Sequence, residues 1–145
     1  MSKADPAHSA SIVESMELLA ERAGDVSGRI LERYFENCPE AAQLMDHMDS
    51  YMLGRMIDQV LLLIMESDDA ELESYLRFET ASHHSYGVQS HMYAKLFDAV
   101  LNVARESCAD AWSDDYQQAW TARLETLLTR ISAADAEYVA QLAVS

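Results

Sequence analysis

The chain has 145 residues, half of them apolar, with only four glycines and two prolines. That length can bury one hydrophobic core, and so few turn-forming residues exclude an all-β sandwich or barrel. The formal net charge is −15, from 25 acidic and 10 basic residues, and this sign excludes nucleic acid and anionic membranes as main partners because it repels both. The acidic excess favours solubility, or else a basic partner protein.

The cysteines and the N-terminal segment indicate a compartment. Cys38 and Cys108 are far apart in the sequence and match no metal-binding spacing, so we expect two free thiols in a reducing cytosol. The first ten residues contain no apolar signal segment, and no run approaches the roughly 18 apolar residues of a membrane-spanning helix. We therefore expect a soluble, cytoplasmic protein.

The first predicted helix follows a disordered lead of residues 1–8. Ser9 or Ser11 can cap this helix, which is expected to end near residue 23. Its apolar residues recur every three or four positions and so share one helical face: Ile12, Met16, Leu19 and Ala23.

A second helix is predicted beyond Gly24 and Asp25, which interrupt the pattern. Its apolar face consists of Val26, Ile30, Tyr34 and Phe35. Pro39 predicts a new short helical turn, because proline is tolerated at a helix start but not in the interior. A polar corner over residues 46–50 follows.

Two further helices are predicted in the middle of the chain. Residues 51–66 form a strongly apolar one, with a face of Met52, Met56, Val60, Leu63 and Ile64. A weaker helix over residues 71–85 follows, and the stretch Ser67-Asp68-Asp69 can cap its start. Gly87 ends it, as a glycine just past a helix often does.

The C-terminal part predicts two long helices. Ser90 can cap the first, whose face is Tyr93, Leu96, Phe97, Val100, Leu101 and Ala104. Ser113 opens the second, and the two acids behind it suit the positive end of the helix dipole. The face of this helix is Tyr116, Trp120, Leu124, Leu127, Leu128 and Ile131. Residues 133–145 are expected to be a helical or frayed tail, so the whole chain, residues 1–145, is predicted to be one all-α domain of about six to eight helices.

Four stretches, in order, carry a family pattern. Residues 83–88 read His-His-Ser-Tyr-Gly-Val, with Tyr93 after them. Residues 34–40 read Tyr-Phe-Glu-Asn-Cys-Pro-Glu, residues 112–120 run from Trp-Ser to Ala-Trp, and residues 13–16 read Val-Glu-Ser-Met. Residues 83–88 with Tyr93 resemble the proximal region of bacterial single-domain globins and flavohaemoglobins. Residues 34–40 resemble the Pro-Glu region of that family, and residues 112–120 resemble its last helix. Residues 13–16 resemble its first helix, although they are one residue short. The resemblance covers residues 12–132 and implies a globin-like fold around a haem-type pocket.

On the proximal side, the resemblance implies haem b with His83 as the iron ligand, because globins supply an imidazole from a rigid helix. His84 is the alternative, one residue out of register. A ligating imidazole donates its other N–H to an acceptor, for which the candidates are carbonyls near Glu79 and Thr80, the Glu79 side chain and Tyr93. Apart from the resemblance, His83 would be interpreted as a surface histidine and Tyr93 as a core tyrosine. Cofactor contacts are also implied for Tyr86, Val88 and Tyr93.

On the distal side, this chain departs from the family. Leu31 stands where flavohaemoglobins have an oxygen-binding Tyr, and Met45 stands where nearly every globin packs a Phe on the porphyrin. Met52, or Leu53 after a one-residue slip, takes the place of a Gln or His. Without a donor, fast oxygen release or autoxidation is expected, unless the Met52 thioether itself binds iron.

Other residues are implied near the same side. Met56 completes the apolar distal pocket with Leu31 and Met52. Arg55 stands where the family often has a base that binds a haem propionate, although a solvated surface Arg explains it equally well. Tyr51 or His47 could turn toward the iron, but both are near the polar corner.

The resemblance therefore predicts a haem-binding globin that holds a diatomic gas (O2, NO or CO). Redox or NO chemistry would require an external reductase, because no reductase domain follows the last helix. The alternative is a haem-free globin-fold module for sensing or protein interaction, which Met45 favours and His83 opposes. A hydrolase or metalloenzyme has less support, because the histidines lack His-Glu-x-x-His spacing and no Gly-rich phosphate loop or Gly-x-Ser-x-Gly is present. The oligomeric state is left open.

Overall fold

A computed structural model describes residues 6–65 and 70–144, and the regular elements in these two ranges are all helical. They are α1 (Pro6–Ala23), α2 (Ser27–Asn37), α3 (Pro39–Leu44), α4 (Ser50–Met65), α5 (Ala70–Ser85), α6 (Ser90–Cys108), the 3-10 turn η1 (Ala109–Ala111) and α7 (Asp114–Val144). The predicted all-α class is thus confirmed. Within the described ranges, no helix combines the length and apolar character needed to cross a membrane.

The ends of the chain differ from the expectation. Helix α1 begins at Pro6, so Ser9 and Ser11 lie inside it and do not cap it. Proline suits a first helical position, because its missing N–H has no intrahelical partner there in any case. The predicted disordered lead is therefore wrong for residues 6–8, and residues 1–5 lie outside the described part. The predicted tail is helical through Val144.

Helix starts are capped partly as predicted. The Ser113 hydroxyl accepts the Tyr116 N–H at 3.1 Å and caps α7. At α6 the prediction is wrong, since the residue before the helix is Gln89, with no side-chain capping bond. Asp49 supplies a cap that the sequence pattern does not predict, with its carboxylate accepting the Met52 N–H at 2.8 Å. The predicted cap at residues 67–69 lies outside the described residues.

The end of α5 is closed by Gly87, as predicted. Gly87 has a φ of +93°, a left-handed conformation that glycine adopts without steric cost. The Val88 N–H donates to the His83 carbonyl and the Gly87 N–H to the His84 carbonyl, both at 3.0 Å. These two bonds are those of a Schellman motif. The run Tyr86-Gly87-Val88 therefore has a structural role in ending the helix that holds His83.

The core is built around α6 and α7. Helix α7 packs against α1, α5 and α6, and α6 packs against α2 and α1. Predicted core residues from all these faces are buried, including Ile12, Ile30, Tyr34, Phe97, Val100, Trp120, Leu127 and Ile131. Other residues of the predicted faces are only half-buried, among them Met16, Phe35, Val60 and Leu128, and Met52 on the predicted face of α4 is 45% exposed.

Arg123 on α7 is buried and holds the end of α4. Its Nε donates to the Ile64 carbonyl at 3.1 Å, and its Nη2 donates to the Leu63 carbonyl at 3.0 Å. The last carbonyls of a helix lack intrahelical partners and carry partial negative charge, so a cation is favourable there. Arg123, a residue of α7, therefore fixes the C-terminal end of α4 to the core.

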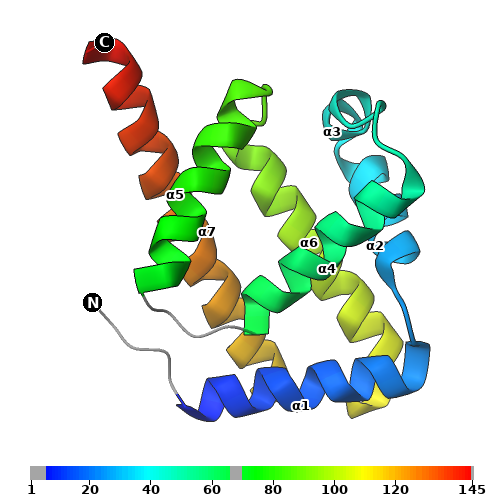
Figure 1. Cartoon of the computed structure of the whole chain (residues 1–145). Coiled ribbons are helices and arrows are strands. Elements are labelled where there is room, and N and C mark those ends of the chain that lie inside the picture. Colours follow the sequence, from blue (N-terminus) through cyan, green and yellow to red (C-terminus); the bar gives the residue numbers. More distant parts are fainter. Residues whose placement is uncertain (1–5, 66–69, 145) are drawn as a thin grey trace.

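Helices α4 and α5 pack against different helices and diverge from one another. Helix α4 packs mainly against α2 and α1, whereas α5 packs against α7. In Figure 1 the end of α4 and the start of α5 lie low in the view, and the two helices diverge upward to the start of α4 and the end of α5. The residues predicted to surround a haem belong to these diverging ends and to their neighbours in α2, α3 and α6.

Candidate functional site

The predicted site residues come from five parts of the fold. Leu31 lies in α2 and Met45 directly follows α3. Helix α4 carries three of them (Met52, Arg55 and Met56), and α5 with its C-terminal turn also carries three (His83, Tyr86 and Val88). Tyr93 lies in the first turn of α6. Among these residues, within the described part of the chain, the pair joined by a hydrogen bond is His83 and Tyr93.

His83 is held at one ring nitrogen. Its Nδ1 lies 3.0 Å from the hydroxyl oxygen of Tyr93, and the two ring centroids are 6.0 Å apart. The imidazole is 42% exposed, and its Nε2 lies 3.5 Å from a Glu79 carboxylate oxygen. Since Tyr93 occupies Nδ1, the nitrogen that remains for a metal or another electrophile is Nε2.

Tyr93 is therefore the outer partner of His83, one of the candidates that the sequence offers. The Glu79 side chain does not take that part, because it faces Nε2 rather than Nδ1. Burial, followed by the charges of Asp135 and Glu79, raises the pKa of the Tyr93 phenol well above its ordinary value. The Tyr93 hydroxyl thus keeps its proton and its hydrogen-bonding capacity at neutral pH.

His84 is engaged elsewhere. Its Nδ1 lies 3.0 Å from an Asp135 carboxylate oxygen of α7, and its ring meets Tyr138 edge-on at 5.3 Å. The Asp135 carboxylate also accepts a hydrogen bond from Ser90 at 3.5 Å. The two neighbouring histidines therefore have different surroundings, His83 with α6 and His84 with α7.

The predicted distal residues are apolar and only partly covered. Leu31, Met45 and Met56 are half-buried against the core, whereas Met52 is 45% exposed. Arg55 is exposed, and its guanidinium lies 5.9 Å from the Tyr51 ring centroid with a hydrogen bond of 3.5 Å to the Tyr51 hydroxyl. Leu31, Met45, Met52 and Met56 thus present thioether and aliphatic groups, and the donors beside them in α4 are the Arg55 guanidinium and the Tyr51 hydroxyl.

Tyr86 and Val88, the residues that flank Gly87, differ in exposure. Tyr86 is 74% exposed, whereas Val88 is half-buried and packs against the core. The half-burial of Val88 agrees with its part in the Schellman motif. Most of the Tyr86 side chain is therefore accessible to solvent.

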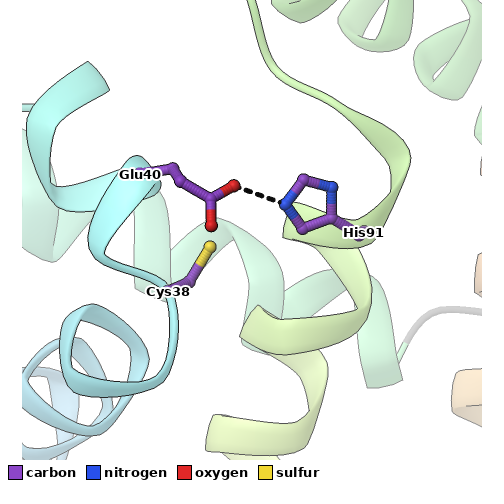
Figure 2. Close-up of side chains that lie close together, drawn as sticks. All are labelled: Cys38, Glu40 and His91. Atoms are coloured by element: carbon purple, nitrogen blue, oxygen red, sulfur yellow. Dashed lines mark hydrogen bonds and ion pairs between the residues drawn. The ribbon is translucent and has the colours of Figure 1, made fainter.

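A second polar cluster combines Cys38, Glu40 and His91, and the sequence patterns do not predict it. A carboxylate oxygen of Glu40 lies 2.7 Å from Nε2 of His91, and the Cys38 Sγ is within 4.8 Å of both ligand atoms. Figure 2 shows the thiol and the imidazole on two sides of the carboxylate. The one local signal is the Cys-Pro-Glu triplet, which places Cys38 and Glu40 together, because His91 joins them only through the packing of the helices.

Comparison of the sequence with models of known protein families and with curated proteins finds no match. The function must therefore be inferred from the residues and their geometry.

Proposed function

We propose that this protein binds haem b within a globin-type fold, with His83 as the axial ligand, and that it holds a diatomic gas (O2, NO or CO). The observation that carries the proposal is the 3.0 Å hydrogen bond between Nδ1 of His83 and the Tyr93 hydroxyl. Metal-binding imidazoles typically donate the N–H of the second nitrogen to an acceptor, here the Tyr93 hydroxyl oxygen, which fixes the ring orientation and raises the basicity of the ligating nitrogen. When bound, haem supplies an iron centre that binds such gases.

The half-buried hydrophobic residues assigned to the pocket suit a flat apolar group. Half-buried hydrophobic residues come from α2, the end of α3, α4 and the turn after α5: Leu31, Leu44, Met45, Met56 and Val88. Covering such side chains stabilises a complex by roughly 25 cal/mol per Å² of apolar surface removed from water. Arg55 is the base proposed for a haem propionate, and it exchanges its contact with Tyr51 for that charge-assisted bond.

The order of elements supports the globin-type proposal. The short α3 begins at Pro39, α5 carries His83 and ends at Gly87, and α7 opens behind the Ser113 cap. These are the regions that resemble bacterial single-domain globins. The single-domain arrangement over residues 1–145 belongs to the same proposal.

The proposed gas side lacks a hydrogen-bond donor. Leu31, Met52 and Met56 carry no N–H or O–H in their side chains, so O2 gains no polar contact from them. The net charge of −15 favours an electron donor with a basic docking face for any redox or NO turnover. A reducing cytoplasm suits the two buried free thiols, Cys38 and Cys108.

The second candidate is a haem-free helical module for sensing or protein interaction. The specific observation in its favour is that Tyr51 and Tyr86 are 70% and 74% exposed near the proposed pocket. Exposed aromatic residues are common at protein interfaces. Met45, in the position of the family's Phe, also favours this alternative.

An absorption titration separates the two candidates. The full chain is titrated with haemin, and the spectrum is recorded before and after reduction with dithionite and then with CO. The proposal expects a Soret band that saturates at one haem per chain, with distinct ferric, ferrous and CO spectra. A spectrum that remains that of free haemin, with near-ultraviolet and far-ultraviolet circular dichroism showing a folded chain, would favour the haem-free module.

A further inference from the structure

The cluster of Cys38, Glu40 and His91 lies at a junction of three helices, apart from His83. Cys38 is the single residue between α2 and α3, Glu40 is the second residue of α3, and His91 is the second residue of α6. Cys38 is buried, at 1% exposure, whereas the Glu40 and His91 side chains are 60% and 45% exposed. The cluster thus has a buried sulfur on the inside and an open side toward solvent.

We propose that this cluster is a binding site for Zn²⁺, with the Cys38 Sγ, a Glu40 carboxylate oxygen and Nε2 of His91 as its three protein ligands. These three ligand atoms all lie within 4.8 Å of one another. Thiolate, imidazole and carboxylate are the ligand types that zinc binds in proteins, at about 2.3 Å for sulfur and about 2.0–2.2 Å for nitrogen and oxygen. A tetrahedral ion places such atoms about 3.3–3.7 Å apart, so on binding the Glu40 oxygen and Nε2 of His91, now 2.7 Å apart, separate to admit the ion.

The backbone holds Cys38 in place for this role. Its N–H donates to the Tyr34 carbonyl at 2.8 Å, and its own carbonyl accepts the N–H of Ala41 at 3.0 Å. The Cys38 backbone is therefore fixed by the end of one helix and the start of the next. Glu40 and His91 are on exposed surfaces, and they can adjust around the ion.

The charges of the three groups match a dication. The Cys38 thiol releases its proton to solvent on binding, so the thiolate and the Glu40 carboxylate together neutralise Zn²⁺ while His91 stays neutral. Without an ion, the Glu40–His91 contact is a hydrogen bond between exposed side chains, which contributes little to stability. The overall charge of −15 also raises the local concentration of cations.

Three protein ligands leave the fourth tetrahedral position for water, on the exposed side of Glu40 and His91. This is the coordination of an open zinc site rather than a closed structural one. Hard cations such as Ca²⁺ and Mg²⁺ prefer all-oxygen sites with more ligands, so the cluster is expected to discriminate strongly against both.

The test uses the reduced full chain, without haemin, in a phosphine reductant. Zn²⁺ affinity is measured by competition with a chromophoric chelator, and Co²⁺ is used as a spectroscopic substitute. We expect one equivalent of tight Zn²⁺ and a near-ultraviolet thiolate-to-Co²⁺ charge-transfer band. Cys38→Ser should abolish that band, whereas Cys108→Ser, which changes the other buried cysteine, should keep it.

Two surface variants keep the test independent of folding. Glu40→Gln and His91→Gln should weaken Zn²⁺ binding by about 100-fold or more, since the loss of even an outer partner of a ligand costs about 10–100-fold. His84→Gln, which removes a histidine from a different carboxylate pair, should leave it unchanged. No stoichiometric binding by the wild type, an unchanged band in Cys38→Ser, or equal affinity for Ca²⁺ would overturn the proposal. Because His83 takes no part in the site, haem and zinc binding can fail separately.

Discussion

The indole N–H of Trp120 donates to the Ser15 hydroxyl at 2.8 Å, and both side chains are almost completely buried. The Ser15 hydroxyl in turn donates to the Ile12 carbonyl at 2.8 Å. The first of these bonds joins α7 to α1 in the core, and the second, within α1, orients the Ser15 hydroxyl.

We expect Trp120→Ala to lower the free energy of unfolding by about 3–5 kcal/mol, the typical cost of removing a large buried aromatic side chain. Chemical denaturation followed by circular dichroism gives the change. Trp112→Ala is the matched control, because Trp112 is only half-buried and should lose less. Equal stability of Trp120→Ala and the wild type would mean that this face of α7 is not in the core.

Ser15→Ala tests the hydrogen bond alone. The variant keeps the packing but leaves the Trp120 indole N–H buried without its acceptor, which costs about 1–3 kcal/mol. The double variant Ser15→Ala with Trp120→Phe should lose less than the two single changes added together, because neither partner remains unpaired. Strict additivity in this double-mutant cycle would show that the bond contributes nothing.

His83→Ala should abolish haem retention on a desalting column, because it removes the proposed axial ligand. His84→Ala should retain haem, since His84 is engaged with Asp135. Glu79→Gln should also retain it, because the carboxylate is only a weak contact at the ligating nitrogen. If His84→Ala loses haem and His83→Ala keeps it, the assigned register is wrong by one residue.

Tyr93→Phe should keep haem but bind it about 10–100-fold more weakly, the usual effect of removing the outer partner of a metal-binding imidazole. Haem transfer to a high-affinity acceptor protein measures the loss. The absorption spectrum of the haem-saturated variant should show the same iron coordination number, five or six, as the wild type. An unchanged haem affinity would mean that the hydrogen bond between His83 and Tyr93 does not support the proposed haem site.

Leu31→Tyr should slow O2 release several-fold while changing CO release little, since a hydrogen-bond donor stabilises the more polar gas complex by about 1 kcal/mol or more. Stopped-flow rates for both gases provide the measurement. Met52→Leu tests whether the exposed thioether competes as a sixth ligand, in which case both gases should bind faster. Slow O2 release from the wild type, unaffected by Met52→Leu, would contradict an apolar gas side.

Tyr116 predicts a loss of stability at alkaline pH. Its hydroxyl donates to a Glu14 carboxylate oxygen at 2.7 Å, and this bond raises the pKa of the phenol to about 12. Since the folded pKa is raised, the stabilisation is fully present below the ordinary pKa of about 10 and is lost as the pH rises toward about 12. Tyr116→Phe should show a smaller decrease in unfolding free energy over this window than the wild type.

The helices and much of the core could be predicted from the sequence, because a period of 3.6 residues places a buried face wherever apolar residues recur. This period alone predicts that Ile30, Trp120 and Leu127 are buried, and the structure confirms it. Met52 shows the limit of the method, because periodicity gives a residue's face but not whether another element covers that face. Met52 lies in the first turn of α4 and is 45% exposed, which the apolar pattern does not predict.

The candidate sites divide in the same way. His83 and Tyr93 are ten residues apart on either side of a helix end, so a family pattern can relate them. Glu40 and His91 are 51 residues apart, and no local spacing links them. Their contact requires the packing of α2 against both α3 and α6, a property of the tertiary structure.

The hydrogen bonds from Arg123 to the Leu63 and Ile64 carbonyls give the two ends of α4 different expected rates of amide exchange with solvent. If the last turn of α4 leaves α7, the buried Arg123 guanidinium loses its bonds to both carbonyls, so the amides there should exchange with solvent only when a large part of the domain opens. The first turn, with exposed Tyr51 and Met52, has no such tie, and its amides should exchange through local fraying. The end of α4 that borders the proposed pocket can therefore rearrange around a ligand while the other end stays fixed to the core.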